Sequence, residues 1–126
     1  MELTVFVVDD DSSLRRSLER LLRLEGWRVR TFGSAEEFLE HCSSGVRGCL
    51  VADVHLGRMS GLELQAILAR MPSTLPVILT SGFDDGVTEA EAVRLGAIAY
   101  LKKPFEAGEL IDSVKRGMNA GTPSGV

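Results

Sequence analysis

Three consecutive acids, Asp9, Asp10 and Asp11, follow directly on an apolar stretch in the sequence VVDDDSS. Another acid, Asp53, follows the apolar residues of LVADVHLG. Carboxylates that lie close together repel one another unless a cation lies between them. Oxygen ligands suit a hard divalent ion, and Mg²⁺ keeps several waters while it takes only one or two carboxylates. These acids therefore predict a magnesium site if the fold brings them together.

Two further residues would suit the transfer of a phosphoryl group at such a site. A carboxylate beside Mg²⁺ can attack phosphorus and form an aspartyl phosphate. The phosphoryl oxygens then need positive charge and a hydroxyl group nearby. Lys103, in AYLKKPF, supplies a mobile positive charge, and Ser81, in VILTSGF, supplies a small hydroxyl donor.

The alternation of apolar runs with helical patterns predicts five strands and five helices. The runs occupy residues 3–8, 27–32, 49–52, 75–80 and 97–101. Three of them are rich in valine and isoleucine and are apolar at consecutive positions, as are parallel strands that are buried on both faces. Short connections with right-handed crossovers then give one doubly wound α/β sheet.

The segments between these runs carry signals for helix starts and ends. A leucine stripe at helical spacing lies within residues 14–22, and a last helix is expected over residues 106–118. Three capping boxes of the S/T-x-x-E type mark helix starts: Ser34 with Glu37, Ser60 with Glu63, and Thr88 with Glu91. The residues that fall where helices should end are Gly26, Gly96 and Pro72.

The polar residues fall at the strand ends where a parallel sheet binds its ligands, beyond the carboxyl ends of the strands. Asp9 and Asp10 follow the first predicted strand, and Asp53 follows the third. Ser81 ends the fourth strand and Lys103 follows the fifth. Four strand ends therefore direct polar groups at one crevice.

The charge of the chain argues against duplex DNA as a direct ligand. The 126 residues predict one domain, with 18 acids against 14 bases and a net charge of −4. Neutralising DNA phosphates needs clustered lysine and arginine. The one local basic feature, Arg15, Arg16, Arg20 and Arg23, has helical spacing and predicts a solvated helix face.

Membrane and secretory signals are missing from the pattern. No apolar run reaches the length of a membrane helix, and the acidic start MELTVFVVDDD does not resemble a signal peptide. Cys42 and Cys49 are expected to be reduced thiols, which is typical of a cytoplasmic protein. Together with Trp27 they are interpreted as packing residues.

With its motifs in this order, the chain resembles the receiver domain of two-component response regulators. The resemblance covers residues 3–118, from VVDDD through the lone Asp53 and TSG to KKPF. It implies a flavodoxin-like sheet of five parallel strands in the order 2-1-3-4-5, with helices on both faces. It also implies a receiver domain at residues 1–119, followed at residues 120–126 by a tail or the start of a linker.

The resemblance implies a role for each acid at the crevice. Asp53 would accept the phosphoryl group. Mg²⁺, with Mn²⁺ as an alternative, would be held by Asp9, Asp10, Asp53 and the backbone carbonyl of His55. Asp11 would lie outside this ligand set, near the start of the first helix, where it could cap exposed N–H groups.

The resemblance also implies a switch. Ser81 and Lys103 would bind phosphoryl oxygens, and the ring of Tyr100 would turn inward when the hydroxyl group moves. The bond between Lys103 and Pro104 would be cis and would suit a tight turn at the site. The face formed by the fourth helix, fifth strand and fifth helix would then change, and would dimerise or release an output domain.

The segments SAEEFLE, SGLEL and GAIAYLKKPFE resemble the FixJ type of receiver. Members of this type carry a C-terminal helix-turn-helix domain like that of LuxR, so DNA would be bound only through a domain that is absent here. A sensor histidine kinase would donate the phosphoryl group. The domain would assist its own phosphorylation and dephosphorylation without being an enzyme.

The chain departs from the family pattern at a few positions. Gly57 stands four residues after the acceptor, where most receivers have proline, and predicts a freer loop. Ser81 replaces the commoner threonine and keeps the hydroxyl group. His55 and Phe83 lie two residues beyond Asp53 and Ser81, at positions that resemble tuners of the phosphate lifetime. A bulky Phe83 is expected to obstruct the attacking water.

Other interpretations stay open at the level of the sequence. A small Mg²⁺-dependent phosphatase with an Asp nucleophile would need a second acid two residues after Asp53, where this chain has His55. A flavodoxin-like cofactor carrier would need a phosphate-binding loop after the first strand, where this chain has three acids. Those acids alone could form a solvated turn, and Tyr100 could be an ordinary core aromatic.

Overall fold

A computed structural model describes residues 3–41, 46–71, 75–82 and 89–120 of the chain. Strands and helices alternate along it, as the sequence predicts. The strands are β1 (Thr4–Val8), β2 (Arg28–Phe32), β3 (Gly48–Asp53), β4 (Val77–Ser81) and β5 (Ala99–Lys102). The helices are α1 (Ser12–Leu24), α2 (Ala35–His41), α3 (Gly61–Ala69), α4 (Glu89–Arg94) and α5 (Ala107–Ala120).

All five strands form one parallel sheet in the order β2-β1-β3-β4-β5. Strand β1 lies between β2 and β3, with Val8 level with Phe32 and with Ala52. The direction of winding therefore changes at β1 and β3, where Asp9 follows β1 and Asp53 ends β3. The predicted doubly wound fold and its strand order are confirmed.

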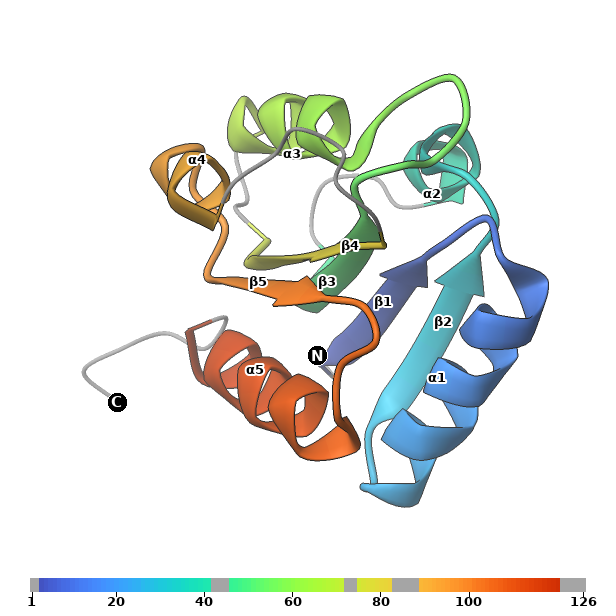
Figure 1. The fold of residues 1–126 in the computed structure, drawn as a ribbon. Coiled ribbons are helices and arrows are strands. Elements are labelled where there is room, and N and C mark those ends of the chain that lie inside the picture. Colours follow the sequence, from blue (N-terminus) through green and yellow to red (C-terminus); the bar gives the residue numbers. More distant parts are fainter. Residues whose placement is uncertain (1–2, 42–45, 72–74, 83–88, 121–126) are drawn as a thin grey trace.

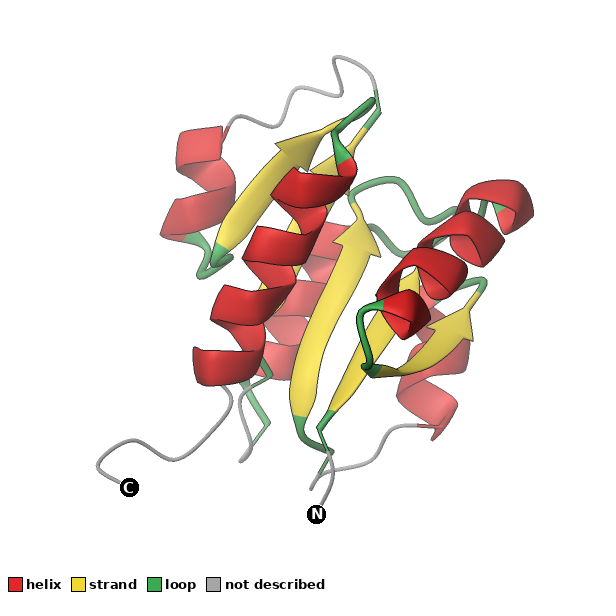
Figure 2. Ribbon diagram, turned by 90° about the horizontal axis from the view of Figure 1, so that it is seen from below, coloured by secondary structure: helices red, strands yellow, loops and turns green. Residues whose placement is uncertain are grey.

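The helices form a layer on each side of the sheet, with α2, α3 and α4 on one face and α1 and α5 on the other (Figures 1 and 2). Alternate residues of each strand pack against opposite layers, since successive side chains of a strand point to opposite faces. Phe6 and Val8 join the core beneath α2–α4, whereas Val5 and Val7 join the core against α1 and α5. The strands β1, β3 and β4 are buried at every position, which explains their apolar runs.

The ends of several elements differ from those predicted by sequence. Strand β4 begins at Val77, two residues later than the apolar run, and Leu75 and Pro76 lead into it. Strand β3 is longer than predicted, from Gly48 to Asp53, so the acid is the last residue of the strand. Gly48 has a φ of 136°, and a Cβ there would lie 1.8 Å from the carbonyl oxygen of Thr4. Only glycine fits this close approach of two backbones. The predicted strand began one residue later, at Cys49, because the prediction used only the run of apolar residues.

The capping signals are confirmed to different extents. Ser60 and Glu63 form both halves of a capping box at the start of α3. The Oγ atom of Ser34 accepts from the backbone N–H of Glu37, but Glu37 in turn accepts from Gly33 instead of Ser34. The pair at residues 88 and 91 and the proline at 72 involve positions outside the described residues.

Two glycines end helices as predicted, and Cys49 and Trp27 both take part in packing. Gly26 and Gly96 follow α1 and α4 with φ values of 96° and 104°, which favour glycine. Cys49 is a buried free thiol, and burial raises its pKa to about 12. Trp27 packs at the edge of the core that α1 and α5 cover. Cys42 lies outside the described residues. In the described part of the chain, no helix has the length and apolar character to span a bilayer.

Candidate phosphoryl-acceptor site

The first two acids lie in a short loop between β1 and α1. Asp9 directly follows β1 and is only 2% exposed, whereas Asp10 is exposed. The backbone N–H of Asp9 donates to the carbonyl of Phe32, which ties the loop to the end of β2. The carboxylate of Asp9 accepts from the backbone N–H of Asp11 at 2.9 Å. The loop thus buries the carboxylate of Asp9 at the carboxyl ends of the strands, which we call the mouth of the sheet, and exposes the carboxylate of Asp10 to solvent.

Asp11 has a different task from its two neighbours. It is the N-cap of α1, and its Oδ1 accepts from the backbone N–H groups of Ser13 and Leu14 at 3.0 and 3.1 Å. Its carboxylate satisfies N–H groups that have no partner within the helix. The expectation that Asp11 caps the first helix is confirmed, and the acidic trio divides into two site acids and one cap.

The remaining acid, Asp53, ends β3 beside β1 and is 6% exposed. Its Oδ1 accepts from the backbone N–H of His55 at 3.0 Å. Its Oδ2 lies 2.7 Å from Nζ of Lys103, and the same Nζ lies 3.0 Å from Oδ2 of Asp9. Lys103 therefore bridges two nearly buried carboxylates that are 44 positions apart in the sequence.

Lys103 reaches the acids from the loop after β5. Its backbone N–H donates to the carbonyl of Ser81 at 2.7 Å, and its peptide bond to Pro104 is cis, as expected. Burial alone lowers the pKa of the ammonium group. The hydrogen bonds to Asp53 and Asp9, with the charges of both carboxylates, outweigh burial and raise that pKa above its usual 10.5. The ammonium group therefore stays charged at neutral pH.

The three acids fit a hard divalent cation. Carboxylate oxygens of Asp9, Asp10 and Asp53 all lie within 4.8 Å of one another. Oxygens bound to Mg²⁺ lie about 2.0–2.1 Å from the ion, so two that share it are separated by at most about 4.2 Å. Small shifts of the side chains, or one water between an acid and the ion, would close the difference. An all-oxygen set with an exposed member suits an ion that keeps several waters.

The other predicted site residues that the structure describes lie on β4, on β5 and in the loop that follows β3. Ser81 is the last residue of β4 and is fully buried. Tyr100 lies on β5 and is half-buried against the core beneath α2–α4. His55 is exposed and contacts Asp53 through its backbone N–H, as described above. Phe83 lies outside the described residues.

Gly57 has a specific backbone conformation. Its φ is 78°, in the region that favours glycine. Proline is restricted to a φ near −65°, so the loop after Asp53 follows a path that a proline at this position could not. The sequence predicted only greater freedom here.

Arg15 was interpreted wrongly from the sequence. We expected it on a solvated face with Arg16, Arg20 and Arg23, but it is partly buried. Its Nη1 donates to the backbone carbonyl of Asp9 at 2.7 Å. Arg15 lies six residues after Asp9, and a loop and the start of α1 separate the two. The sequence does not predict this contact, because the contact depends on the angle between α1 and the sheet.

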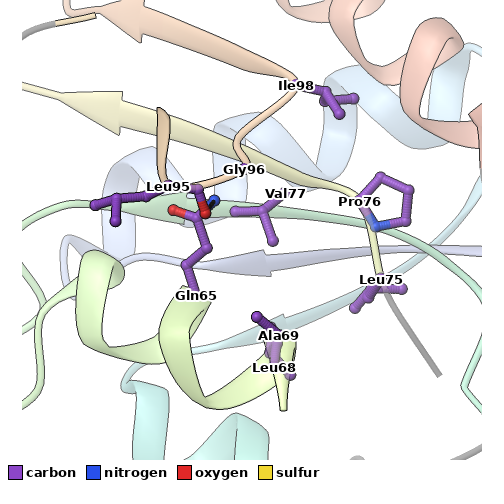
Figure 3. Close-up of a pocket in the computed structure, with 9 residues that line it drawn as sticks. All are labelled: Gln65, Leu68, Ala69, Leu75, Pro76, Val77, Leu95, Gly96 and Ile98. Carbon is purple, nitrogen blue, oxygen red and sulfur yellow. Dashed lines mark hydrogen bonds between the residues drawn. The ribbon is translucent and has the colours of Figure 1, made fainter. Parts of the chain in front are cut away.

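A separate cavity of about 260 Å³ lies at the other end of the sheet, between α3 and the starts of β4 and β5 (Figure 3). Gln65 donates from Nε2 to the carbonyl of Leu95, and its Oε1 is buried with no hydrogen-bond partner among the described residues. Leu68, Val77 and Ile98 supply apolar walls. The described residues that line this cavity carry no titratable side chain, so it offers none of the chemistry of the acidic site.

The fold and site together define a doubly wound α/β domain with three clustered acids and a bridging lysine at the carboxyl end of its sheet. The family model described as the response regulator receiver domain matches residues 5–115. The chain therefore belongs to the response regulator receiver family.

The chain is similar to curated regulators along most of its length. It is 43% identical over 115 residues to the transcriptional regulatory protein TdiR of Thauera aromatica, a match that covers 91% of this chain and 51% of TdiR. It is 46% identical over 110 residues to nodulation protein W of Bradyrhizobium diazoefficiens, with 87% and 48% covered. The chain thus spans about half the length of these relatives.

Solved structures agree with the fold and with the FixJ type. The crystal structure of FixJ-N superposes with a TM-score of 0.87 at 34% identity and covers 98% of both chains. The response regulator StyR superposes with a TM-score of 0.89 at 40% identity, covering 96% of this chain and 61% of StyR. The predicted resemblance to FixJ-type receivers is confirmed.

Proposed function

We propose that this domain is a phosphorylation-activated switch that accepts a phosphoryl group on Asp53. The observation that carries the proposal is the Lys103 ammonium group, which bridges Asp53 and Asp9 beside a third carboxylate. A carboxylate oxygen of Asp53 would form a bond to phosphorus as the bond between phosphorus and the donor breaks. Lys103 would then pair with the new phosphoryl oxygens and stabilise their charge.

The acids at the mouth of the sheet suit a magnesium ion. Asp9, Asp10 and Asp53 would hold it, together with the backbone carbonyl of His55, and Mn²⁺ could replace it. When bound, the ion neutralises charge on the phosphoryl oxygens. Lys103 and the backbone N–H of His55 already hold the Asp53 carboxylate in place, which limits the reorganisation that the reaction requires.

The signal would leave the site through β4 and β5. Ser81 ends β4, and its carbonyl accepts from the backbone of Lys103, so a shift of one affects the other. Tyr100, on β5, would turn inward when the Ser81 hydroxyl group moves to the phosphate. Val93 in α4 and Leu95 directly after it are apolar and about half exposed, and they would suit a surface that changes partners. His55 and Phe83 would tune the lifetime of the phosphate.

The proposal extends to partners. A sensor histidine kinase would donate the phosphoryl group, in the cytoplasm where ATP is available. The face of α4, β5 and α5 would then dimerise or control an output domain. We assign residues 1–119 to the receiver domain and residues 120–126 to a tail or linker that leads to such a domain. DNA would be bound through that domain, because this chain has a net charge of −4.

A phosphatase with an Asp nucleophile is less well supported. Such an enzyme would use a second acid two residues after the nucleophile to protonate its leaving group. His55 occupies that position and is exposed, with its backbone N–H on Asp53. The domain is therefore proposed to act on itself and to have no separate substrate.

Intact-mass measurement tests the proposed acceptor. After incubation with Mg²⁺ and phosphoramidate, the wild type should gain one phosphoryl group that is stable in acid and labile in alkali. Asp53→Asn should gain none, because the amide is not a nucleophile toward phosphorus. Asp112→Asn, which changes an exposed acid of α5, should behave like the wild type. Phosphorylation of Asp53→Asn, or multiple turnover of added phosphate esters by the wild type, would contradict the proposal.

A further inference from the structure

Arg15 connects α1 to the loop that carries the first two site acids. It is the fourth residue of α1, and its backbone N–H donates to the carbonyl of Asp11 at 2.9 Å. Its side chain turns back toward the sheet, where Nη1 donates to the carbonyl of Asp9 at 2.7 Å. The guanidinium group lies against Gly33, where a Cβ would be 3.3 Å from Nη1. The side chain is thus enclosed between the start of α1 and the loop after β2.

The bond from Arg15 acts on the peptide group that precedes Asp10. Asp9 is fixed at its N–H by Phe32 and at its side chain by Asp11 and Lys103. Its carbonyl belongs to the peptide that orients the backbone of Asp10. Asp10 is exposed, so neighbouring side chains do little to hold its carboxylate, and the orientation of this peptide decides where it points.

We propose that Arg15 is a positioning residue that fixes the peptide between Asp9 and Asp10 and so sets the affinity of the site for Mg²⁺. This inference rests on the proposed function for its physiological meaning. Arg15 acts through the backbone and does not touch the ion. Partners that orient metal ligands typically change metal affinity by about 10–100-fold when they are removed.

The positive charge of Arg15 would weaken Mg²⁺ binding, whereas its positioning role would strengthen it. A positive charge beside a cation site repels the ion, so its removal would tighten Mg²⁺ binding if charge were its only influence. Loss of positioning would weaken binding. The sign of the change in dissociation constant therefore separates the two roles.

The test is a titration of Mg²⁺ followed by the amide NMR signals of the loop after β1. Arg15→Ala should raise the dissociation constant for Mg²⁺ by about 10-fold, and Arg15→Lys should recover part of the loss. Gly33→Ala keeps the charge of Arg15 but crowds its guanidinium group. This variant should therefore raise the dissociation constant for Mg²⁺ by a smaller factor. Arg16→Ala removes an equal charge from an exposed position and serves as the matched control.

A second measurement separates positioning from a general loss of structure. At saturating Mg²⁺, the rate at which phosphoramidate phosphorylates Arg15→Ala should return close to that of the wild type, because only ion binding is impaired. An unchanged or tighter dissociation constant in Arg15→Ala would overturn the proposal, as would a rate that stays low at saturating Mg²⁺. If the wild type bound Mg²⁺ but were not phosphorylated, the proposed function would fail while the comparison of dissociation constants still tested Arg15.

Discussion

At the scale of single residues, the site depends on charges that compensate one another. Asp9 and Asp53 are almost fully buried, and a buried carboxylate is costly unless it is paired. Lys103 pairs with both, and its side chain is itself only 20% exposed. Because one ammonium group faces three acids, the cluster keeps a net negative charge that favours a cation. The lysine thus stabilises the metal-free state without removing the attraction for Mg²⁺.

This pairing predicts how stability depends on pH. The pKa of Lys103 is higher in the folded protein than its usual 10.5, so folding favours the charged form. Its contribution to the free energy of unfolding is fully present below 10.5 and is lost as the pH rises through the raised pKa. Urea unfolding of the metal-free protein should therefore show Lys103→Gln less stable than the wild type at neutral pH. The difference in free energy of unfolding between the two proteins should become smaller above pH 10.5.

Lys115→Gln is a suitable control for this measurement, because Lys115 is an exposed lysine of α5. It should show little difference from the wild type across the same pH range. A gap for Lys103→Gln that stayed constant into strongly alkaline solution would mean that its ammonium group does not stabilise the buried acids.

At the scale of elements, α3 and the end of β3 approach each other unusually closely. Gly61 begins α3, and its backbone N–H donates to the carbonyl of Val54 at 2.9 Å. A Cβ on Gly61 would lie 2.4 Å from the carbonyl oxygen of Asp53. The backbone of the proposed acceptor is therefore in direct contact with the start of a helix, and only the smallest residue leaves room for it.

Two glycine substitutions should have opposite effects on stability. Gly61→Ala should lower the free energy of unfolding by about 1–3 kcal/mol, since the added methyl group must displace backbone. Gly108→Ala, in α5, meets no atom within 4 Å and should raise the free energy of unfolding by about 0.4–1 kcal/mol. Urea unfolding measures both. Equal effects of the two substitutions would show that α3 can move away from β3 without cost.

At the scale of the whole molecule, the parallel sheet gathers the ends of β1, β3 and β5 into a single mouth. The hydrogen bond from Lys103 to Asp9 links two distant parts of the chain, because Lys103 follows β5 and Asp9 follows β1. A ligand that binds the folded protein and not the unfolded chain stabilises the whole fold. Metal binding at the mouth should therefore be visible as a change in global unfolding.

Thermal unfolding in Mg²⁺ and in EDTA tests this coupling. Mg²⁺ at a hundredfold excess over its dissociation constant should stabilise the wild type by about 2.7 kcal/mol and raise its Tm. Asp10→Asn should melt higher than the wild type in EDTA, because one repelling charge is gone, and should gain little from Mg²⁺. Asp112→Asn should respond to Mg²⁺ like the wild type. A full response to Mg²⁺ in Asp10→Asn would exclude Asp10 as a ligand.

The sequence by itself determined the number and order of strands and helices, the receiver family and the identity of the acids and lysine at the strand ends. These features follow from local patterns: buried and mostly apolar runs in β1, β3 and β4, a leucine stripe in α1, and polar residues where the apolar runs stop. The capping box of Ser60 and Glu63 and the glycines after α1 and α4 are equally local, which is why they were predictable.

Only the tertiary structure decided how those residues meet. The sequence predicted that Asp9, Asp53 and Lys103 meet at one crevice, but the structure shows that one ammonium group bridges both carboxylates. The contact of Arg15 with the Asp9 carbonyl and the fit of Gly61 against β3 were not predicted. Such contacts depend on the distance and angle at which layers pack, and these are set by the summed shapes of many side chains. A pattern of residue types fixes which face is buried, but it does not fix which atoms touch.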